Sequence, residues 1–228
     1  MKSFPARRWT GRRASRSKRD FWHAIGMQLR QPSGQGGKVA GWLMRFINAR
    51  PYSLALEALE ARPDDTVLEL GFGPGFGIAR LAQLVSHGRV IGIDASEVML
   101  GQALHRNRKA ICRGRVRLVL GSFSRLPLPE ESCDRILAVN VAYFFHPDGR
   151  EIRESRRVLK SGGRLVLYVT DERSMRRWPL AGPESHRLLD AESLRDLVRC
   201  GGFARENIEV REAILPFGIR GLLAVVHK

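Results

Sequence analysis

Hydrophobic positions follow two alternating patterns from residue 51 onward. Runs of consecutive apolar residues, such as 165–169, are typical of strands buried on both faces, and apolar residues at i, i+3, i+4 and i+7 are typical of helices packed on one side. The patterns predict a helix from Pro51, strands at 66–71, 89–94, 115–120, 134–140 and 164–170, and helices at 75–86, 96–111, 148–159 and 191–200. This alternation predicts a doubly wound, mostly parallel, Rossmann-like α/β sheet.

The last two predicted strands are connected differently from the others. Residues 204–211 and 221–227 are separated only by 212–220, which is too short for a helical crossover and long enough for a hairpin. We therefore expect a seven-stranded sheet with one antiparallel strand near an edge.

The first fifty residues do not share this regularity. Residues 1–20 hold eight Lys and Arg and one acid, and they contain few hydrophobic side chains that could form a core. This composition is typical of a basic flexible arm, or of an arm that binds a nucleic acid or a membrane surface. Residues 21–50 carry two short apolar stretches around a glycine-rich segment at 31–37, which predicts a helical lid. The expected division is an arm (1–20), a lid (21–50) and an α/β domain (51–228).

Composition narrows the class of protein. A chain of 228 residues with 43% hydrophobic and 27% charged residues fits one ordinary globular domain, and its net charge of +16 favours anionic neighbours. The three scattered cysteines lack zinc or disulfide spacing, no apolar run reaches the roughly 18 residues of a membrane span, and no apolar export segment follows the basic start. We expect a reduced, cytoplasmic protein without a metal site.

The strongest chemical signal is the sequence VLELGFGPGFG at 67–77. Alternating glycines allow a sharp turn from a strand into a helix, and they leave backbone atoms bare for a ligand. The dinucleotide pattern GxGxxG fails in both registers, because Phe76 and Ile78 stand where glycine is required, and the lysine of a P-loop is absent.

An acid two residues before a GxGxG loop instead resembles motif I of the class I S-adenosylmethionine-dependent methyltransferases. Three further stretches resemble that family in the expected order: VIGID at 90–94 with GSF at 121–123, LPLPEESCD at 126–134, and RVLKSGGRL at 157–165. The resemblance covers about 51–228 and is closest to the quinone-biosynthesis-like, small-molecule branch. It implies S-adenosylmethionine as the cofactor.

The resemblance also implies roles for particular residues. Glu69 would lie near the methionine amino group, or else organise the glycine loop, and Asp94 would accept from the ribose hydroxyls. Ser122 departs from the family, which often has an acid there for the adenine amino group. The cofactor-binding residues expected are Glu69, Gly71, Phe72, Gly73, Gly75, Asp94, Ala95, Met99, Gly121, Ser122, Phe123 and Asn140.

The acceptor side is expected after the fourth strand, in NVAYFFHP at 140–147. Tyr143 and His146 are the candidate catalytic residues, with core packing and a structural loop position as their alternative interpretations. Arg173, Arg176 and Arg177 either recognise an acidic group of the substrate or are simply solvated.

These features favour a methyltransferase with a small-molecule acceptor, because lid segments at 21–50 and 171–190 can enclose a compact molecule. The alternatives are an RNA methyltransferase that uses the basic arm and a non-catalytic module that binds the cofactor. A nicotinamide-dependent oxidoreductase is disfavoured by the failed dinucleotide pattern. The acceptor, the methylated atom and the oligomeric state are left open.

Overall fold

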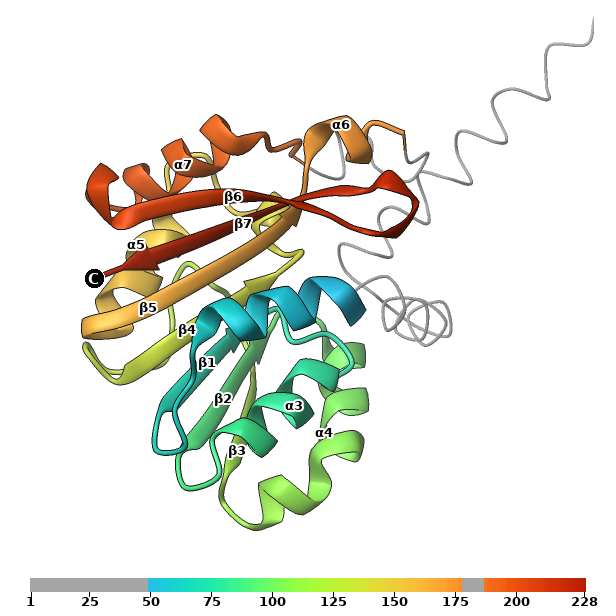
Figure 1. Ribbon diagram of the computed structural model, residues 1–228. Coiled ribbons are helices and arrows are strands. Elements are labelled where there is room, and N and C mark those ends of the chain that lie inside the picture. The colour runs from blue at the N-terminus through green and yellow to red at the C-terminus, as the bar shows by residue number, and fades with distance from the viewer. Residues whose placement is uncertain (1–48, 178–186) are drawn as a thin grey trace, which may run out of the picture.

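The computed structural model describes residues 49–177 and 187–228, and its centre is a seven-stranded sheet in the order β3-β2-β1-β4-β5-β7-β6 (Figure 1). β7 is antiparallel to both of its neighbours, and β1 to β5 pair in parallel. The predicted doubly wound sheet with an antiparallel strand near one edge is therefore confirmed. The strands are β1 (Thr66–Leu70), β2 (Arg89–Asp94), β3 (Val116–Leu120), β4 (Cys133–Val139), β5 (Leu159–Thr170), β6 (Ile208–Ile214) and β7 (Arg220–His227).

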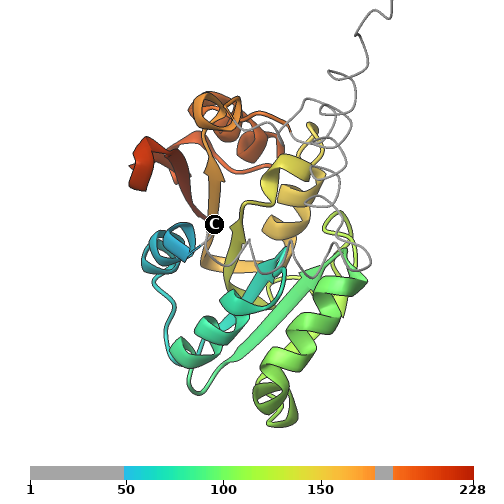
Figure 2. The same cartoon turned by 90° about the vertical axis from the view of Figure 1, so that its right-hand side faces the viewer.

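Helices cover both faces of the sheet (Figures 1 and 2). The helix at 49–59, α3 and α4 contribute Ala55, Ile78 and Ala103, respectively, to one hydrophobic cluster. On the other face, α5 and α7 contribute Ile152 and Leu194 to a second cluster. The sheet is thus the middle of three layers. The helices are α3 (Phe76–Leu84), α4 (Glu97–Cys112), α5 (Arg150–Val158), α6 (Glu172–Met175) and α7 (Ala191–Cys200).

Two strands differ from their predicted bounds by more than two residues, and the first described helix begins before its predicted start. β5 begins at Leu159 rather than 164, because its pairing with β4 shifts register between Cys133 and Arg135 and so accommodates Gly162 and Gly163. β6 begins at Ile208 rather than 204, because the polar residues before it form a 3₁₀ turn. The first described helix already includes residues 49 and 50, so it begins before Pro51.

The arm at 1–20 and all of the predicted lid at 21–50 except its last two residues lie outside the described residues, as does 178–186. Among the residues that the structure describes, no helix is long and apolar enough to cross a membrane.

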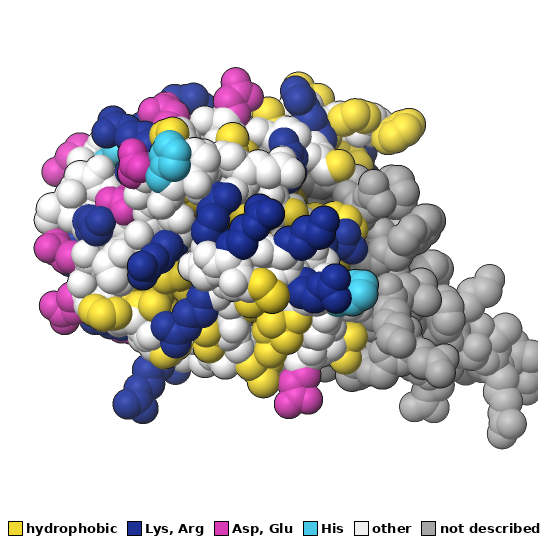
Figure 3. All heavy atoms as spheres, turned by 90° about the horizontal axis from the view of Figure 1, so that it is seen from below, with side chains coloured by type: hydrophobic (Ala, Val, Ile, Leu, Met, Phe, Trp, Pro, Cys, Tyr) yellow, Lys and Arg dark blue, Asp and Glu magenta, His cyan; other side chains and the backbone are white. Residues whose placement is uncertain are grey.

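Charge is unevenly spread over the surface. Figure 3 views the molecule from below, the side on which α3, α4 and β3 lie in Figure 1. Lys and Arg side chains gather across the middle of this face, and most of the acidic side chains in view lie toward its left and upper rim.

Candidate functional site

The turn from β1 into α3 is built on Gly71, Gly73 and Gly75, whose φ angles are 68°, 53° and 80°. A Cβ on Gly71 would lie 2.7 Å from a methyl group of Val141, and a Cβ on Gly75 would lie 2.7 Å from that of Ala103. A Cβ on Gly73 would meet no atom of a described residue within 4 Å. Gly71 and Gly75 are therefore required for packing, whereas Gly73 borders open space in which a ligand can lie against the backbone.

The inner side of α4 supports this loop. Asn107 Nδ2 donates to the carbonyl oxygen of Gly75 at 3.1 Å, and Arg106 Nε donates to that of Pro74 at 3.0 Å. The guanidinium of Arg106 also lies 3.5 Å from the ring centroid of Phe76. These supports were missed from the sequence, although a polar Asn107 on the apolar side of a predicted helix was a usable signal.

Asp94 ends β2 beside the glycine loop, as predicted. Its Oδ2 accepts from the Gly73 N–H at 2.8 Å and its Oδ1 from the Ser96 N–H at 2.9 Å. Burial raises the pKa of Asp94, and the backbone N–H donors partly oppose that rise. Ser96 caps α4, because its Oγ accepts from the Met99 N–H.

Glu69 is fully buried on the opposite side of the same loop. Its Oε1 accepts from the hydroxyl of Tyr52, which comes from the helix at 49–59, and its Oε2 has no hydrogen-bond partner among the described residues. Burial raises the pKa of Glu69 to about 8, against the lowering effect of the Tyr52 hydroxyl. The pattern that predicts a helix from Pro51 gives no sign of this role for Tyr52.

An unpartnered buried carboxylate oxygen fits a cationic ligand group, because it would otherwise lose its hydration without compensation. The ammonium of an amino acid moiety has the required charge and hydrogen-bond donors. Together with the open space at Gly73 and the carboxylate of Asp94, Glu69 gives this crevice the groups that an adenosyl amino acid requires.

The loop after β3 lies beside Asp94, since the Gly121 N–H donates to the Asp94 carbonyl oxygen at 2.9 Å. Ser122 is exposed, and its Oγ lies 2.8 Å from that of Ser124. The Phe123 ring is half-buried, with its centroid 5.9 Å from that of Phe145. Among the other residues expected to bind the cofactor, the side chains of Met99 and Phe72 are buried, whereas that of Ala95 is exposed.

The segment after β4 separates the two candidate catalytic residues. Tyr143 is buried, and its hydroxyl donates to Asn140 Oδ1 at 2.7 Å and accepts from the Thr170 N–H. Burial raises the pKa of Tyr143 above its usual value. His146 is 52% exposed, and its Nδ1 lies 3.0 Å from Asp148 Oδ1. The structure therefore brings Tyr143 and Asn140 together and places His146 at the surface.

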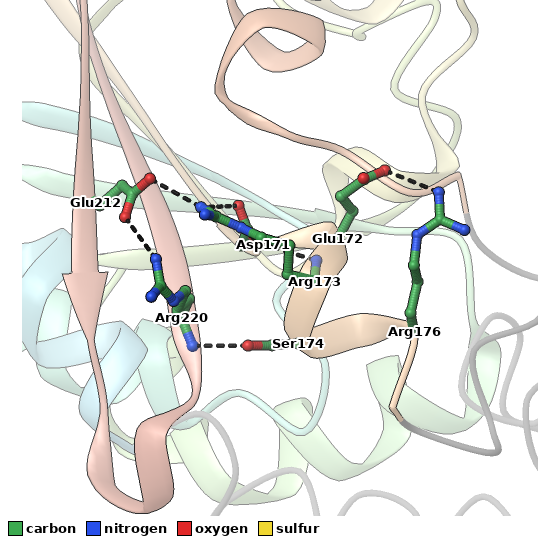
Figure 4. Close-up of polar contacts among 7 residues, drawn as sticks. All are labelled: Asp171, Glu172, Arg173, Ser174, Arg176, Glu212 and Arg220. Carbon is green, nitrogen blue, oxygen red and sulfur yellow. Dashed lines mark hydrogen bonds and ion pairs between the residues drawn. The ribbon is translucent and has the colours of Figure 1, made fainter.

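Arg173 lies in an ionic network between α6 and the β6–β7 hairpin (Figure 4). Its guanidinium contacts Asp171 Oδ1 and Glu212 Oε1, each at 2.8 Å, and Arg220 lies 3.5 Å from the other oxygen of Glu212. The Arg220 N–H also donates to Ser174 Oγ at 2.8 Å. The network ties α6 to the hairpin.

Arg173, Arg176 and Arg177, which were interpreted either as recognising an acidic substrate group or as solvated, differ in their surroundings. Arg173 is paired as above, and Arg176 is paired with Glu172 at 3.3 Å (Figure 4). Arg177 is exposed. Arg173 and Arg176 thus have their charges compensated by carboxylates of the chain itself.

Comparison with known proteins agrees with this geometry. A family model described as "Methyltransferase domain" matches residues 68–167. A protein of transposon TN4556 from Streptomyces fradiae is 42% identical over 54% of this chain and 35% of its own length. An uncharacterized methyltransferase, YdaC of Bacillus subtilis, is 28% identical over 76% of this chain and 89% of its own. The demethylmenaquinone methyltransferase of Symbiobacterium thermophilum is 32% identical over 46% of this chain and 42% of its own.

Solved structures share the fold at lower identity. A SAM-dependent methyltransferase from Aquifex aeolicus is 21% identical, with a TM-score of 0.63 over 80% of this chain and 93% of its own. Geranyl diphosphate C-methyltransferase from Streptomyces coelicolor A3(2), solved with geranyl diphosphate and S-adenosylhomocysteine, is 14% identical, with a TM-score of 0.64 over 86% of this chain and 84% of its own. Residues 68–167 therefore match a methyltransferase domain, and solved S-adenosylmethionine-dependent methyltransferases share the fold of the chain.

Proposed function

We propose that the chain transfers the methyl group of S-adenosylmethionine to a small-molecule acceptor. The observation that carries the proposal is the unpartnered Oε2 of buried Glu69 beside a glycine loop that borders open space at Gly73. The names of similar proteins support a compact acceptor, since one is a demethylmenaquinone methyltransferase and another a geranyl diphosphate C-methyltransferase.

Each side of the crevice would hold one part of the cofactor. Glu69 would accept a hydrogen bond from the amino group of the cofactor. Asp94 would accept from the ribose hydroxyls through the carboxylate lone pairs that the N–H groups of Gly73 and Ser96 do not use. Gly73 would allow the cofactor to approach the backbone closely. The other proposed contacts are Gly71, Phe72, Gly75, Ala95, Met99, Gly121, Ser122, Phe123 and Asn140.

When bound, this cofactor supplies a methyl group on a positively charged sulfur, which is already a good leaving group. The residues of the chain then have to position the acceptor and exclude water, and good orientation alone supplies several kcal/mol, within the ~7–11 kcal/mol seen in intramolecular reactions. Tyr143 would act by holding Asn140 in its left-handed conformation, at φ 54°, through the 2.7 Å hydrogen bond. His146, with Asp148 beside it, is the proposed general base.

The proposal can be tested with the full chain, methyl-labelled S-adenosylmethionine, a metabolite extract and a separate RNA pool. We expect label in a small metabolite, and we expect S-adenosylhomocysteine but not NAD to raise the melting temperature. Label in RNA would replace the proposed acceptor class with the alternative based on the basic arm. Strong binding without any transfer would indicate a non-catalytic module, and no melting shift would refute the cofactor site.

The cysteines do not conflict with a reduced compartment, because Cys112, Cys133 and Cys200 are all free. A cytoplasmic location is part of the proposal.

A further inference from the structure

The positive charge of the folded domain is concentrated in one part of the sequence. Residues 70–129 hold nine Lys and Arg and only two acids, Asp94 and Glu97, and no acid occurs between 98 and 129. Residues 130–228, by contrast, hold 17 Lys and Arg and 15 acids. The first of these segments builds α3, α4, β2 and β3.

Ion pairs follow the same division. Leaving Arg106 aside, every Lys or Arg that forms an ion pair among the described residues lies at position 135 or beyond, for example Arg150 with Asp148 and Arg199 with Asp196. The other cations of the 70–129 segment form no ion pair with a described residue, so their charges add to one positive field.

The outer side of α4 presents the densest part of this charge. His105, Arg108, Lys109 and Arg113, which we call the α4 basic face, are all exposed, and none forms an ion pair with a described residue. Their spacing of i, i+3, i+4 and i+8 places them on one side of the helix. Figure 3 shows the side of the molecule on which α4 lies, and Lys and Arg side chains gather across the middle of that face.

Lys109 and Arg113 lie in the last turn and at the C-cap of α4, where the helix dipole favours cations. The stripe from His105 to Arg113 is about 12 Å long at ~1.5 Å per residue, which is enough for its cations to contact about three consecutive phosphates.

The chemistry of this face favours a phosphodiester chain over a bilayer. Two of the three Lys and Arg of this face, Arg108 and Arg113, are arginine, which binds phosphate through two parallel hydrogen bonds. A helix that lies in a membrane surface needs an apolar side to insert, but the outer side of α4 carries no aromatic residue, and Leu104 at its border is 41% exposed.

We infer that the α4 basic face binds the phosphate backbone of a nucleic acid. The face borders the candidate active site without forming part of it. Arg106, which lies beside Lys109 and Arg113 on α4, and buried Asn107 contact the glycine loop, whereas no hydrogen bond joins the four residues of the face to that loop among the described residues. This inference does not rest on the proposed function, since bound nucleic acid need not be methylated.

The test uses the full chain and a fluorescent, unstructured RNA of about 20 nucleotides, with binding followed by anisotropy over a range of salt concentrations. The face variant combines Arg108→Gln, Lys109→Gln and Arg113→Gln. The matched control combines Arg199→Gln, Arg205→Gln and Arg211→Gln, which removes the same net charge from exposed positions on α7, the following turn and β6.

We expect the face variant to bind about 10- to 100-fold more weakly at 0.1 M salt than the unmodified chain, and the control to bind nearly as well. The slope of log affinity against log salt should fall by about 2, because each lost phosphate contact on a single strand contributes ~0.7. Both variants should keep the melting shift with S-adenosylhomocysteine, which verifies folding. If the triple variant fails to fold, the single changes Lys109→Gln and Arg113→Gln should each lower the slope by ~0.7.

Three outcomes would overturn the inference. One is absence of RNA binding by the unmodified chain, and another is equal weakening in the face variant and the control, which would attribute binding to net charge or to the arm at 1–20. The third is loss of binding to phosphatidylserine vesicles in the face variant with RNA binding intact, which would identify a membrane surface instead.

Discussion

The buried carboxyl of Glu69 predicts opposite effects on stability and on cofactor binding. In Glu69→Gln the amide oxygen can still accept from the Tyr52 hydroxyl, but the negative charge is lost. Folding raises the pKa of Glu69 from 4.5 to about 8, chiefly through burial. Such a group favours the folded state most below pH 4.5, and that contribution is lost as the pH rises toward 8.

The size of the change in unfolding free energy follows from the pKa shift, because one pKa unit corresponds to about 1.4 kcal/mol. Between pH 5 and pH 7.5, both inside the window from 4.5 to about 8, the unmodified protein should lose roughly 3 kcal/mol of stability relative to Glu69→Gln. For a domain of this size that corresponds to roughly 6–12 °C in melting temperature. The variant should therefore become the more stable protein as the pH rises, while its affinity for S-adenosylhomocysteine falls.

The assay is a series of melting curves for both proteins from pH 5 to pH 8.5, with and without S-adenosylhomocysteine. In the unmodified protein, cofactor binding should also tighten by up to about tenfold per pH unit below 8, because the ammonium binds the ionised carboxylate. A melting difference between the two proteins that stays constant across this range would refute the argument. Unchanged affinity in the variant would remove Glu69 from the cofactor site.

Three further predictions concern the same site. Asp94→Ala should weaken binding of S-adenosylhomocysteine about tenfold by calorimetry, as expected for hydrogen bonds to a charged group at about 1.5–3 kcal/mol, and equal affinity would refute the ribose role. Gly75→Ala should unfold at a much lower denaturant concentration than Gly73→Ala, because its Cβ would lie 2.6 Å from Asn107 Nδ2. Gly73→Ala should fold but bind the cofactor poorly. If Gly73→Ala were instead the less stable variant and Gly75→Ala the weaker binder, the role of the open space would be contradicted. His146→Asn should lower kcat about 10²- to 10⁴-fold without changing cofactor affinity if His146 is the base, and an unchanged kcat would exclude it.

The sheet was predictable because each of its signals is local. Apolar runs defined the parallel strands, and the short connection before the last strand was enough to predict an antiparallel return. The predicted bounds were wrong where a longer-range effect acted. β5 begins five residues early because β4 pairs with it across a register shift, and nothing within residues 159–164 alone reveals that partner.

Residues of the site were predictable where a family motif marks them. One motif contains the glycine loop and Glu69, a second contains Asp94, and these groups lie together as the order of the motifs implied. Tyr52 and Asn107 belong to neither motif and lie 17 and 32 residues from the groups they contact, so no pattern in the sequence joins them to the site. The pairing of Arg173 with Glu212 was hidden for the same reason, at 39 residues.

Tyr52 also shows that the candidate site extends beyond the residues that match the family model. That match begins at residue 68, yet the hydroxyl that holds Glu69 Oε1 comes from the helix at 49–59. Because this hydrogen bond occupies one oxygen of Glu69, it leaves the other as the acceptor for a cation. A change in the position of that helix would therefore alter the charge and orientation of the proposed cofactor ligand without touching the glycine loop, so the proposed functional unit includes the helix at 49–59.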